Sequence, residues 1–201
     1  MRNKNLRFIS EVGIFVAVGL VLDYLAGMYS RPIFPQGGSI SVAMVAIFII
    51  AFRWGLKGGL LTGFIIGSLQ VIYSNVFGWG LSPIILISLI FIDYILGYTA
   101  VGLAGIYAKK IKQAETGGKL NYITNGILLA GTVRTVLHII SGWLFFREWI
   151  PAFIVEDYVW YYWSIIYNFG YMVPSVLLCL LVTKAIVRRY EKILNPAQPI
   201  I

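Results

Sequence analysis

Long apolar runs alternate with short polar breaks along the whole chain. A transmembrane helix needs roughly 20 apolar residues, and every run except the second approaches or exceeds that length. The breaks are rich in Gly, Pro and charged residues, which favour turns over helix. The pattern predicts an all-α integral membrane protein with six transmembrane helices in a single membrane domain, residues 1–201. The expected spans are 8–28, 39–53, 56–76, 83–108, 120–146 and 161–187.

The composition supports lipid as the solvent of this chain. Hydrophobic residues make up 59% of it and charged residues 12%, which is half of the roughly 25% found in soluble domains. A single cysteine, Cys179, excludes an internal disulfide. One histidine and one cysteine are also too few for a structural zinc site. We expect no bound metal, and we also expect no cofactor.

Basic residues fall mainly on one side of the predicted bundle. Only Arg31 and Arg147 fall on the other side, and Arg134 lies within a span. The positive-inside rule therefore predicts cytoplasmic N- and C-termini, which requires an even number of spans. The net charge of +8 is then a topology signal and not a sign of nucleic-acid binding. The basic residues on the N-terminal side are Arg2, Lys4, Arg7, Arg53, Lys57, Lys109, Lys110, Lys112, Lys119, Lys184, Arg188, Arg189 and Lys192.

Small residues recur at four-residue spacing in three of the spans, and the fourth span carries Ala100, Ala104 and Ala108. The third span carries a ridge from Gly55 to Gly67, and the first carries Gly13 and Ala17. Such ridges let helix backbones approach closely, since packing drives helix association in lipid. Two interpretations are open: packing inside the bundle, or a docking surface for another membrane subunit.

Charged residues inside spans are costly and are functional candidates by default. Glu11 lies close to the inner end, where it can pair with Arg7, and we interpret it as structural. The polar residues within the spans are Glu11, Asp23, Asp93, Arg134 and His138, with Asn168 as a neutral addition.

Three of these residues lie at one depth. At 1.5 Å per residue, Asp93, His138 and Asn168 each lie roughly 10–15 Å below the outer surface, on three different helices. They predict a cavity that opens to the outside. Arg134 lies one turn below His138 on the same face, where it can pair with a carboxylate or set the charge of the imidazole. The alternatives are a packing role for His138 and a buried structural salt bridge between Asp93 and Arg134.

Aromatic residues crowd the outer ends of the fifth and sixth spans. Most of them fit an interfacial belt, but Trp163 and Tyr167 continue down toward Asn168 at helical spacing. Aromatic faces above a carboxylate suit a small, flat, positively charged ligand, through stacking and cation–π attraction. The crowded residues are Trp143, Phe145, Phe146, Trp149, Tyr158, Trp160, Tyr161, Tyr162, Trp163 and Tyr167.

The chain offers little for catalysis. Ser141 follows His138 by three residues, but neither an orienting third group nor a glycine-rich oxyanion loop accompanies the pair. The chain also has no phosphate-cradling loop, so it cannot use ATP by itself. We expect a protein that is not an enzyme and has no catalytic residues.

Four motifs follow one another in register over about residues 37–175. They are Gly37-Gly38-Ser39-Ile40-Ser41 with Ile49 to Lys57, Asp93-Tyr94 with Val101 to Gly105, Arg134 and His138 with Ile140-Ser141-Gly142, and Ser164 to Asn168 with Tyr171, Met172 and Pro174. Together they resemble the ThiT family, the thiamine-binding membrane subunits (S components) of energy-coupling factor (ECF) transporters.

The resemblance implies an S-component-like bundle of six helices in the plasma membrane of a bacterium. It would bind thiamine from outside and associate with a transmembrane coupling subunit and two cytoplasmic ATPases. The family's small-residue pattern for docking the coupling subunit matches Gly13 and Ala17. The ridge from Gly55 to Gly67 would then serve internal packing.

The resemblance also assigns ligand-binding roles. Asp93 matches the acidic ligand residue, where some members have glutamate, and Tyr94 the tyrosine beside it. His138 and Asn168 match the binding histidine and the asparagine of the sixth helix. Three further ligand contacts are expected on the fifth and sixth helices: Phe146 in place of a stacking tryptophan, Trp163 in place of a tyrosine, and Tyr167. The last is Phe34, in an outer lid loop at 26–38, with Tyr29 as the alternative. Arg134 and Trp143 would support these contacts.

A second function is compatible with the same residues. A stand-alone secondary carrier for a cationic heteroaromatic solute could use Asp93 or His138 as a proton relay. Uptake by this chain alone, driven by a proton gradient, would distinguish it from a subunit of an ATP-driven importer.

Overall fold

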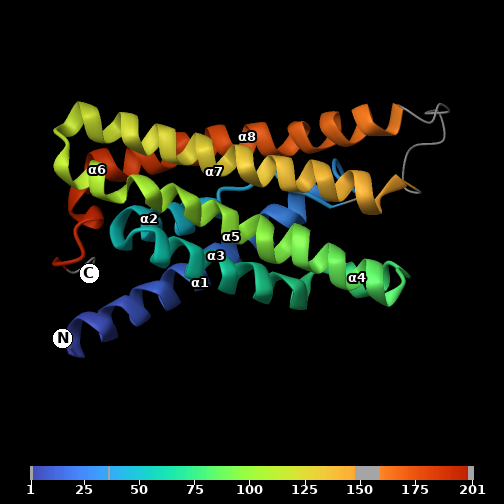
Figure 1. The fold of residues 1–201 in the computed structure, drawn as a ribbon, viewed down its shortest axis with the longest axis horizontal. Coiled ribbons are helices and arrows are strands. Elements are labelled where there is room, and N and C mark those ends of the chain that lie inside the picture. Colours follow the sequence, from blue (N-terminus) through green and yellow to red (C-terminus); the bar gives the residue numbers. More distant parts are fainter. Residues whose placement is uncertain (1, 36, 148–158, 199–201) are drawn as a thin grey trace.

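The computed structural model describes residues 2–35, 37–147 and 159–198 as a helical bundle (Figure 1). Within these residues, five helices are long and apolar enough to cross a membrane, and a shorter apolar helix accompanies them. The helices are α1 (Arg2–Ser30), α2 (Met44–Trp54), α3 (Leu56–Tyr73), η1 (Asn75–Gly78), α4 (Pro83–Leu89), η2 (Ile90–Leu96), α5 (Gly97–Val101), η3 (Gly102–Tyr107), α6 (Ala108–Gln113), α7 (Thr116–Phe145), α8 (Val159–Arg189) and η5 (Glu191–Leu194).

The fourth span is one long rod that changes its helical type along its length. Residues 83–113 form a continuous helical stretch of 31 residues that is apolar enough to cross a membrane. Within it, α4 passes through the π-helical segment η2 into α5, then through the 3₁₀ segment η3 into α6. Pro83 occupies the first turn of α4, where its missing N–H costs nothing.

The second span differs from the expected helix over 39–53. Helix α2 begins only at Met44, and residues 38–42 before it are not helical. The reason is a set of contacts with α8: the backbone N–H of Ser41 donates to the hydroxyl of Ser175 at 2.9 Å, and that hydroxyl is 3.1 Å from the carbonyl of Ser39. These contacts satisfy backbone groups that a helix would otherwise pair.

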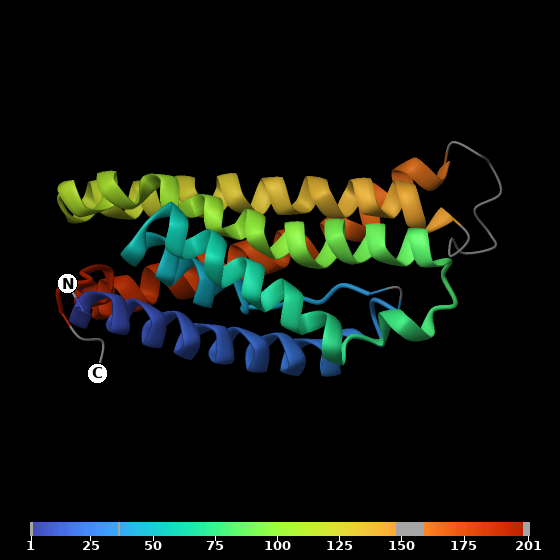
Figure 2. The ribbon, with the colours of Figure 1, turned by 60° about the horizontal axis from the view of Figure 1, so that its bottom comes forward.

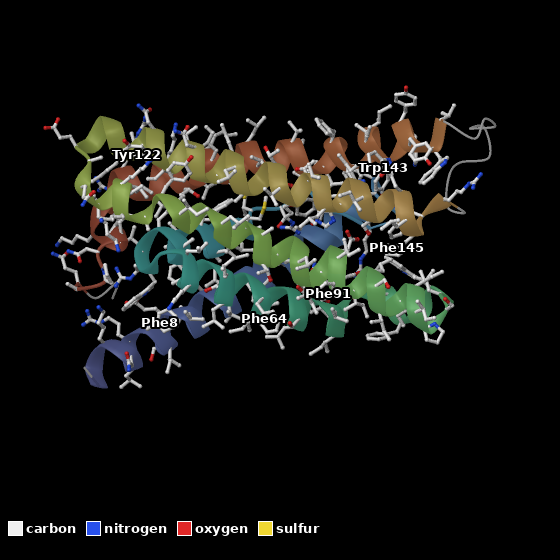
Figure 3. The ribbon with its side chains drawn as sticks, viewed as in Figure 1. Phe8, Phe64, Phe91, Tyr122, Trp143 and Phe145 are labelled. Carbon is white, nitrogen blue, oxygen red and sulfur yellow. The ribbon has the colours of Figure 1, made fainter. Side chains whose placement is uncertain are left out.

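Helix α2 is short because it does not face lipid. Every residue from Met44 to Arg53 is buried, and α2 packs against α1, α3, α8 and η3. Phe48 and Phe52 stack within this core with their ring centroids 6.3 Å apart. Lipid instead meets aromatic side chains such as Phe64 and Phe91, which are exposed on the outside of the bundle (Figure 3).

The glycine ridge of α3 packs inside the bundle, which confirms the first of its two interpretations. A Cβ on Gly59 would lie 2.7 Å from the carbonyl oxygen of Gly102. One turn and two turns further along, a Cβ on Gly63 or Gly67 would overlap the backbone carbonyl of Tyr98 or Tyr94. Only glycine lets α3 approach the fourth span this closely.

Both termini lie at the same end of the bundle (Figure 1). Helix α1 runs along the side opposite α7 (Figure 2). The turn between α6 and α7 also lies at the end of the termini (Figure 1). The arrangement thus brings the basic segments together, and their charge predicts that this end faces the cytoplasm.

A buried ion pair organises the end of the bundle that holds the termini, and its partners differ from those expected. Glu11 pairs with Arg53, at 2.5 and 2.6 Å, and not with Arg7. Trp54 donates a third hydrogen bond to Glu11 at 2.6 Å. Arg7 instead donates to the carbonyl of Pro196 at 3.0 Å. Glu11 is therefore structural, as expected, but its partner is a residue that the sequence places in a loop.

Candidate functional site

A cavity of about 450 Å³ lies in the half of the bundle away from the termini. This volume falls in the usual range of small-molecule sites, roughly 300–1,000 Å³. Its walls come from α1, α3, η2, α5, α7 and α8, and from the segment between α1 and α2. The cavity therefore joins nearly every long element of the bundle.

A carboxylate, an imidazole and a guanidinium form a chain along one wall. The Nδ1 atom of His138 lies 2.6 Å from Oδ1 of Asp93. The Nε–H of Arg134 donates to Nε2 of His138 at 3.1 Å. The side chains of Asp93 and His138 are 20% and 10% exposed, so both reach the cavity while most of their surface is covered. His138 thus lies between Asp93 and Arg134, in place of the direct salt bridge that was one alternative.

The π-helical segment η2 carries the acidic end of this chain. Asp93 and Tyr94 both lie on η2 and both line the cavity. Short π-helical insertions occur frequently at functional sites. Gly97 follows directly, and a Cβ there would lie 3.5 Å from Nε2 of His138. Gly97 therefore lies directly beside the imidazole.

A second polar cluster surrounds Asp23 on α1. This carboxylate is only 5% exposed and accepts hydrogen bonds from the hydroxyl of Tyr98, from Nε2 of Gln70 at 2.6 Å and from the hydroxyl of Tyr73 at 2.9 Å. The guanidinium carbon of Arg134 lies 3.8 Å from the centre of the Tyr98 ring. Arg134 therefore joins the cluster of Asp23 to the chain of Asp93.

Aromatic rings close the cavity toward the segment between α1 and α2. Phe34 meets the rings of Tyr167 and Tyr171 edge-on, with centroids 5.6 and 5.5 Å apart. The hydroxyl of Tyr167 donates to the carbonyl of Gly37 at 2.8 Å. Gly38 has a φ of +92°, and a Cβ there would lie 2.5 Å from the Tyr171 ring. Gly37 also has a positive φ, of 95°, so two glycines supply the backbone conformation with which the segment lines the cavity.

The expected lid loop at 26–38 begins later than predicted. Helix α1 continues to Ser30, so the covering segment starts at Arg31. Phe34 lies in this segment and lines the cavity. Tyr29, the alternative, is 58% exposed and its hydroxyl donates to the carbonyl of Ile40 at 2.5 Å, outside the lining.

Most of the expected site residues come together in the cavity. In the described part of the chain, Trp143 and Trp163 are not among its lining residues. Trp143 lies near the outer end of α7 (Figure 3), and its indole donates to the carbonyl of Tyr161 at 3.0 Å. Trp163 packs beside Tyr167, with ring centroids 6.1 Å apart. The expected residues that line the cavity are Phe34, Asp93, Tyr94, Arg134, His138, Phe146, Tyr167 and Asn168.

Asn168 lines the cavity but already has protein partners. Its Nδ2 donates to the carbonyl of Ser164 at 2.8 Å, and its Oδ1 accepts from the hydroxyl of Tyr171 at 2.5 Å. These bonds fix the orientation of the amide and hold Tyr171 against the cavity.

Several lining residues were not foreseen from the sequence. Tyr98 follows Tyr94 by four residues and Tyr171 follows Asn168 by three, so helical spacing places each near an expected site residue. Asp23 was evident as a charge within a span but had no assigned role. The lining residues to which the sequence analysis gave no role in the site include Asp23, Gln70, Tyr73, Trp79, Tyr98 and Tyr171.

The charges around the cavity favour a cation. Asp23 and Asp93 supply two carboxylates, and Arg134 supplies one guanidinium. With a neutral imidazole at His138, the enclosed groups carry a net charge of −1. Arg31 also lines the cavity, but its side chain is exposed, where solvent screens it.

The fold and the cavity together define a multi-pass membrane protein with an aromatic-walled site for a small solute. Comparison with known proteins supplies the family. The model of the "Thiamine transporter protein" family matches residues 9–195, and this chain belongs to that family. The thiamine transporter ThiT of Bacillus subtilis (strain 168) is 36% identical over 185 residues, covering 90% of each chain.

A solved structure shows the same fold. A structure of ThiT from Listeria monocytogenes matches with a TM-score of 0.79, covering 96% of this chain and 100% of that one, at 22% identity. The bundle described here is therefore the fold of a solved ThiT protein, and the expectation of an S-component-like bundle is confirmed.

Proposed function

We propose that this chain is the substrate-binding S component of an ECF importer and that it binds thiamine from the outer side of the membrane. The observation that carries the proposal is the pair of Asp93 and His138 in an aromatic-walled cavity with a net charge of −1. Thiamine has two flat rings joined by a methylene bridge and carries one positive charge, on its thiazolium ring. It therefore balances the enclosed charge, and both of its rings can stack on aromatic faces.

The proposed ligand contacts follow from the lining. Asp93 supplies the carboxylate, and Tyr94 and His138 flank it on η2 and α7. Phe34, Phe146 and Tyr167 provide aromatic surface from three different segments. Asn168 accepts a hydrogen bond from the hydroxyl of Tyr171 and so positions that ring, and Trp163 packs against Tyr167 and positions it in the same way.

A fluorescence titration tests the proposal. Trp79 lines the cavity, so thiamine bound there is expected to quench its emission. Asp93→Ala should weaken binding by about 1–3 kcal/mol, because it removes a charge-assisted hydrogen bond. Glu115→Ala removes an exposed carboxylate outside the cavity and serves as the control. A folded protein that shows no quenching at micromolar thiamine would refute the proposal.

We also propose that α1 docks the transmembrane coupling subunit, with two ATPase subunits supplying the energy. Gly13 and Ala17 are exposed on α1, and nothing lies within 4 Å of a Cβ placed on Gly13. A neighbouring helix could therefore approach closely along this stripe.

Two matched substitutions test the docking surface. Ala17→Leu should abolish thiamine uptake by the assembled importer while leaving thiamine binding by the isolated chain unchanged. Ala185→Leu makes the same change at an exposed position on α8 and should alter neither quantity. Normal uptake by the Ala17→Leu importer would rule out this face of α1.

A further inference from the structure

Arg134 makes a contact that restricts where His138 can carry its proton. The Nε atom of Arg134 lies 3.1 Å from Nε2 of His138. Arginine nitrogens donate hydrogen bonds and do not accept them, since the guanidinium stays protonated in proteins. Nε2 must therefore be the acceptor, and it carries no proton.

The other ring nitrogen must then carry the proton. An imidazole keeps at least one N–H, so an unprotonated Nε2 requires a protonated Nδ1. That Nδ1 lies 2.6 Å from Oδ1 of Asp93, to which it donates. The chain of hydrogen bonds runs in one direction only, from Arg134 through His138 to Asp93.

We infer that Arg134 is a positioning residue that fixes His138 as the neutral Nδ1–H tautomer and so presents Asp93 to the cavity as an acceptor. The bound group must then be a hydrogen-bond donor or a cation. This inference rests on the proposed function only in its reference to thiamine, since the tautomer itself is a property of the empty protein.

The surroundings hold Arg134 in place for this role. It is 9% exposed, and its guanidinium carbon lies 3.8 Å from the centre of the Tyr98 ring. The hydroxyl of Tyr98 donates to Asp23, which fixes the ring on which the guanidinium rests. Arginine stacks on aromatic faces in a way that lysine does not.

The neighbouring tyrosine does not compete for Nε2. The ring of Tyr171 meets the imidazole edge-on with centroids 6.0 Å apart. Its hydroxyl donates to Oδ1 of Asn168 at 2.5 Å and is therefore not available to donate to His138. Arg134 is thus the donor that sets the tautomer.

The chain has one histidine, which makes a direct test possible. Nitrogen-15 NMR of histidine-labelled protein in detergent distinguishes protonated from unprotonated ring nitrogens and assigns each to its position. The wild-type protein without ligand is expected to show a protonated Nδ1 and an unprotonated Nε2. A protonated Nε2, in either the neutral or the doubly protonated ring, would overturn the inference without any variant.

Substitution of Arg134 provides the second readout. In Arg134→Met the unprotonated Nε2 signal should be lost, and thiamine affinity should fall by about tenfold or more. Arg134→Lys keeps a donor and a charge, so its affinity should lie between those of the methionine variant and wild type. Thr135→Ser alters a neighbouring residue that bonds only along α7 and should leave the spectrum unchanged. An unchanged Nδ1–H spectrum in folded Arg134→Met would overturn the inference.

The two proposals can fail separately. A wild-type spectrum with the Nδ1–H pattern in a protein that does not bind thiamine would refute the proposed function and leave the role of Arg134 intact. A protein that binds thiamine but shows a protonated Nε2 would support the proposed function and refute the role of Arg134.

Discussion

Two guanidinium groups are buried in the described part of the chain, one at the end that holds the termini and one beside the cavity, and their surroundings differ. Arg53, at the end with the termini, is fully buried and donates to both carboxylate oxygens of Glu11. It also donates to the carbonyls of Ile193, Asn195 and Gln198, at 2.6–2.9 Å. Arg134 borders the cavity, donates to His138 and rests on an aromatic ring.

The difference separates a structural charge from a functional one. The guanidinium of Arg53 is enclosed by protein acceptors, and its hydrogen bonds tie the segment after α8 to α1 and α2. Arg53 does not line the cavity. The interactions of Arg134 end at groups that line the cavity. A buried charge whose partners all belong to the scaffold contributes to stability and orientation, whereas one whose partners face a cavity affects what binds there.

The largest effect on stability is expected from breaking the ion pair between Arg53 and Glu11. Arg53→Met leaves Glu11 buried without its ionic partner, so the free energy of unfolding should fall by about 3–5 kcal/mol. Thermal denaturation in detergent would measure the loss. Lys57→Met removes an exposed charge at the same end and should change stability by at most about 0.5 kcal/mol.

The same variant also tests whether Arg53 affects ligand binding, as Arg134 is expected to do. Folded Arg53→Met at low temperature should bind thiamine with wild-type affinity, because Arg53 does not line the cavity. A large loss of affinity in folded protein would mean that the ion pair between Arg53 and Glu11 is coupled to the site.

A smaller effect on binding is expected at the far wall of the cavity. Asp23→Asn removes one of the two carboxylates that give the cavity its charge, and it leaves one of the hydrogen-bond donors around position 23 without an acceptor. Thiamine affinity should fall by about 1–3 kcal/mol. Isothermal titration of Asp23→Asn beside Glu115→Gln would measure it, and equal affinities would remove Asp23 from the charge balance.

The sequence predicts which polar residues line the cavity better than it predicts the helices around them. Asp93 and His138 were identified because a charge in a span is costly and because depth follows from helix rise. The roles of Tyr98 and Tyr171 depend on which helix faces turn toward each other, and a single sequence does not contain that information. Their residue type is also common at membrane interfaces, so nothing marked them as polar groups of a cavity.

Two features of the fold were hidden for a similar reason. Arg53 occupies a break between apolar runs and has the sequence context of a loop cation, yet it is fully buried. The non-helical backbone before Met44 depends on the hydroxyl of Ser175, which is 134 residues away from Ser41. Contacts at such separations override the local apolar pattern, so the run at 39–53 was expected to be helical throughout.

The smallest effect is expected on the rate of thiamine dissociation, from a change at the segment between α1 and α2 that lines the cavity. Tyr167→Phe keeps the ring against Phe34 but removes the hydrogen bond to the carbonyl of Gly37. A neutral hydrogen bond contributes about 0.5–1.5 kcal/mol, so thiamine should dissociate about 2- to 13-fold faster. Stopped-flow fluorescence would measure the rate, with Tyr161→Phe at the exposed outer end of α8 as the control. An unchanged rate would mean that the segment is held over the cavity by its glycines and by Phe34, and that Tyr167 contributes through its ring alone.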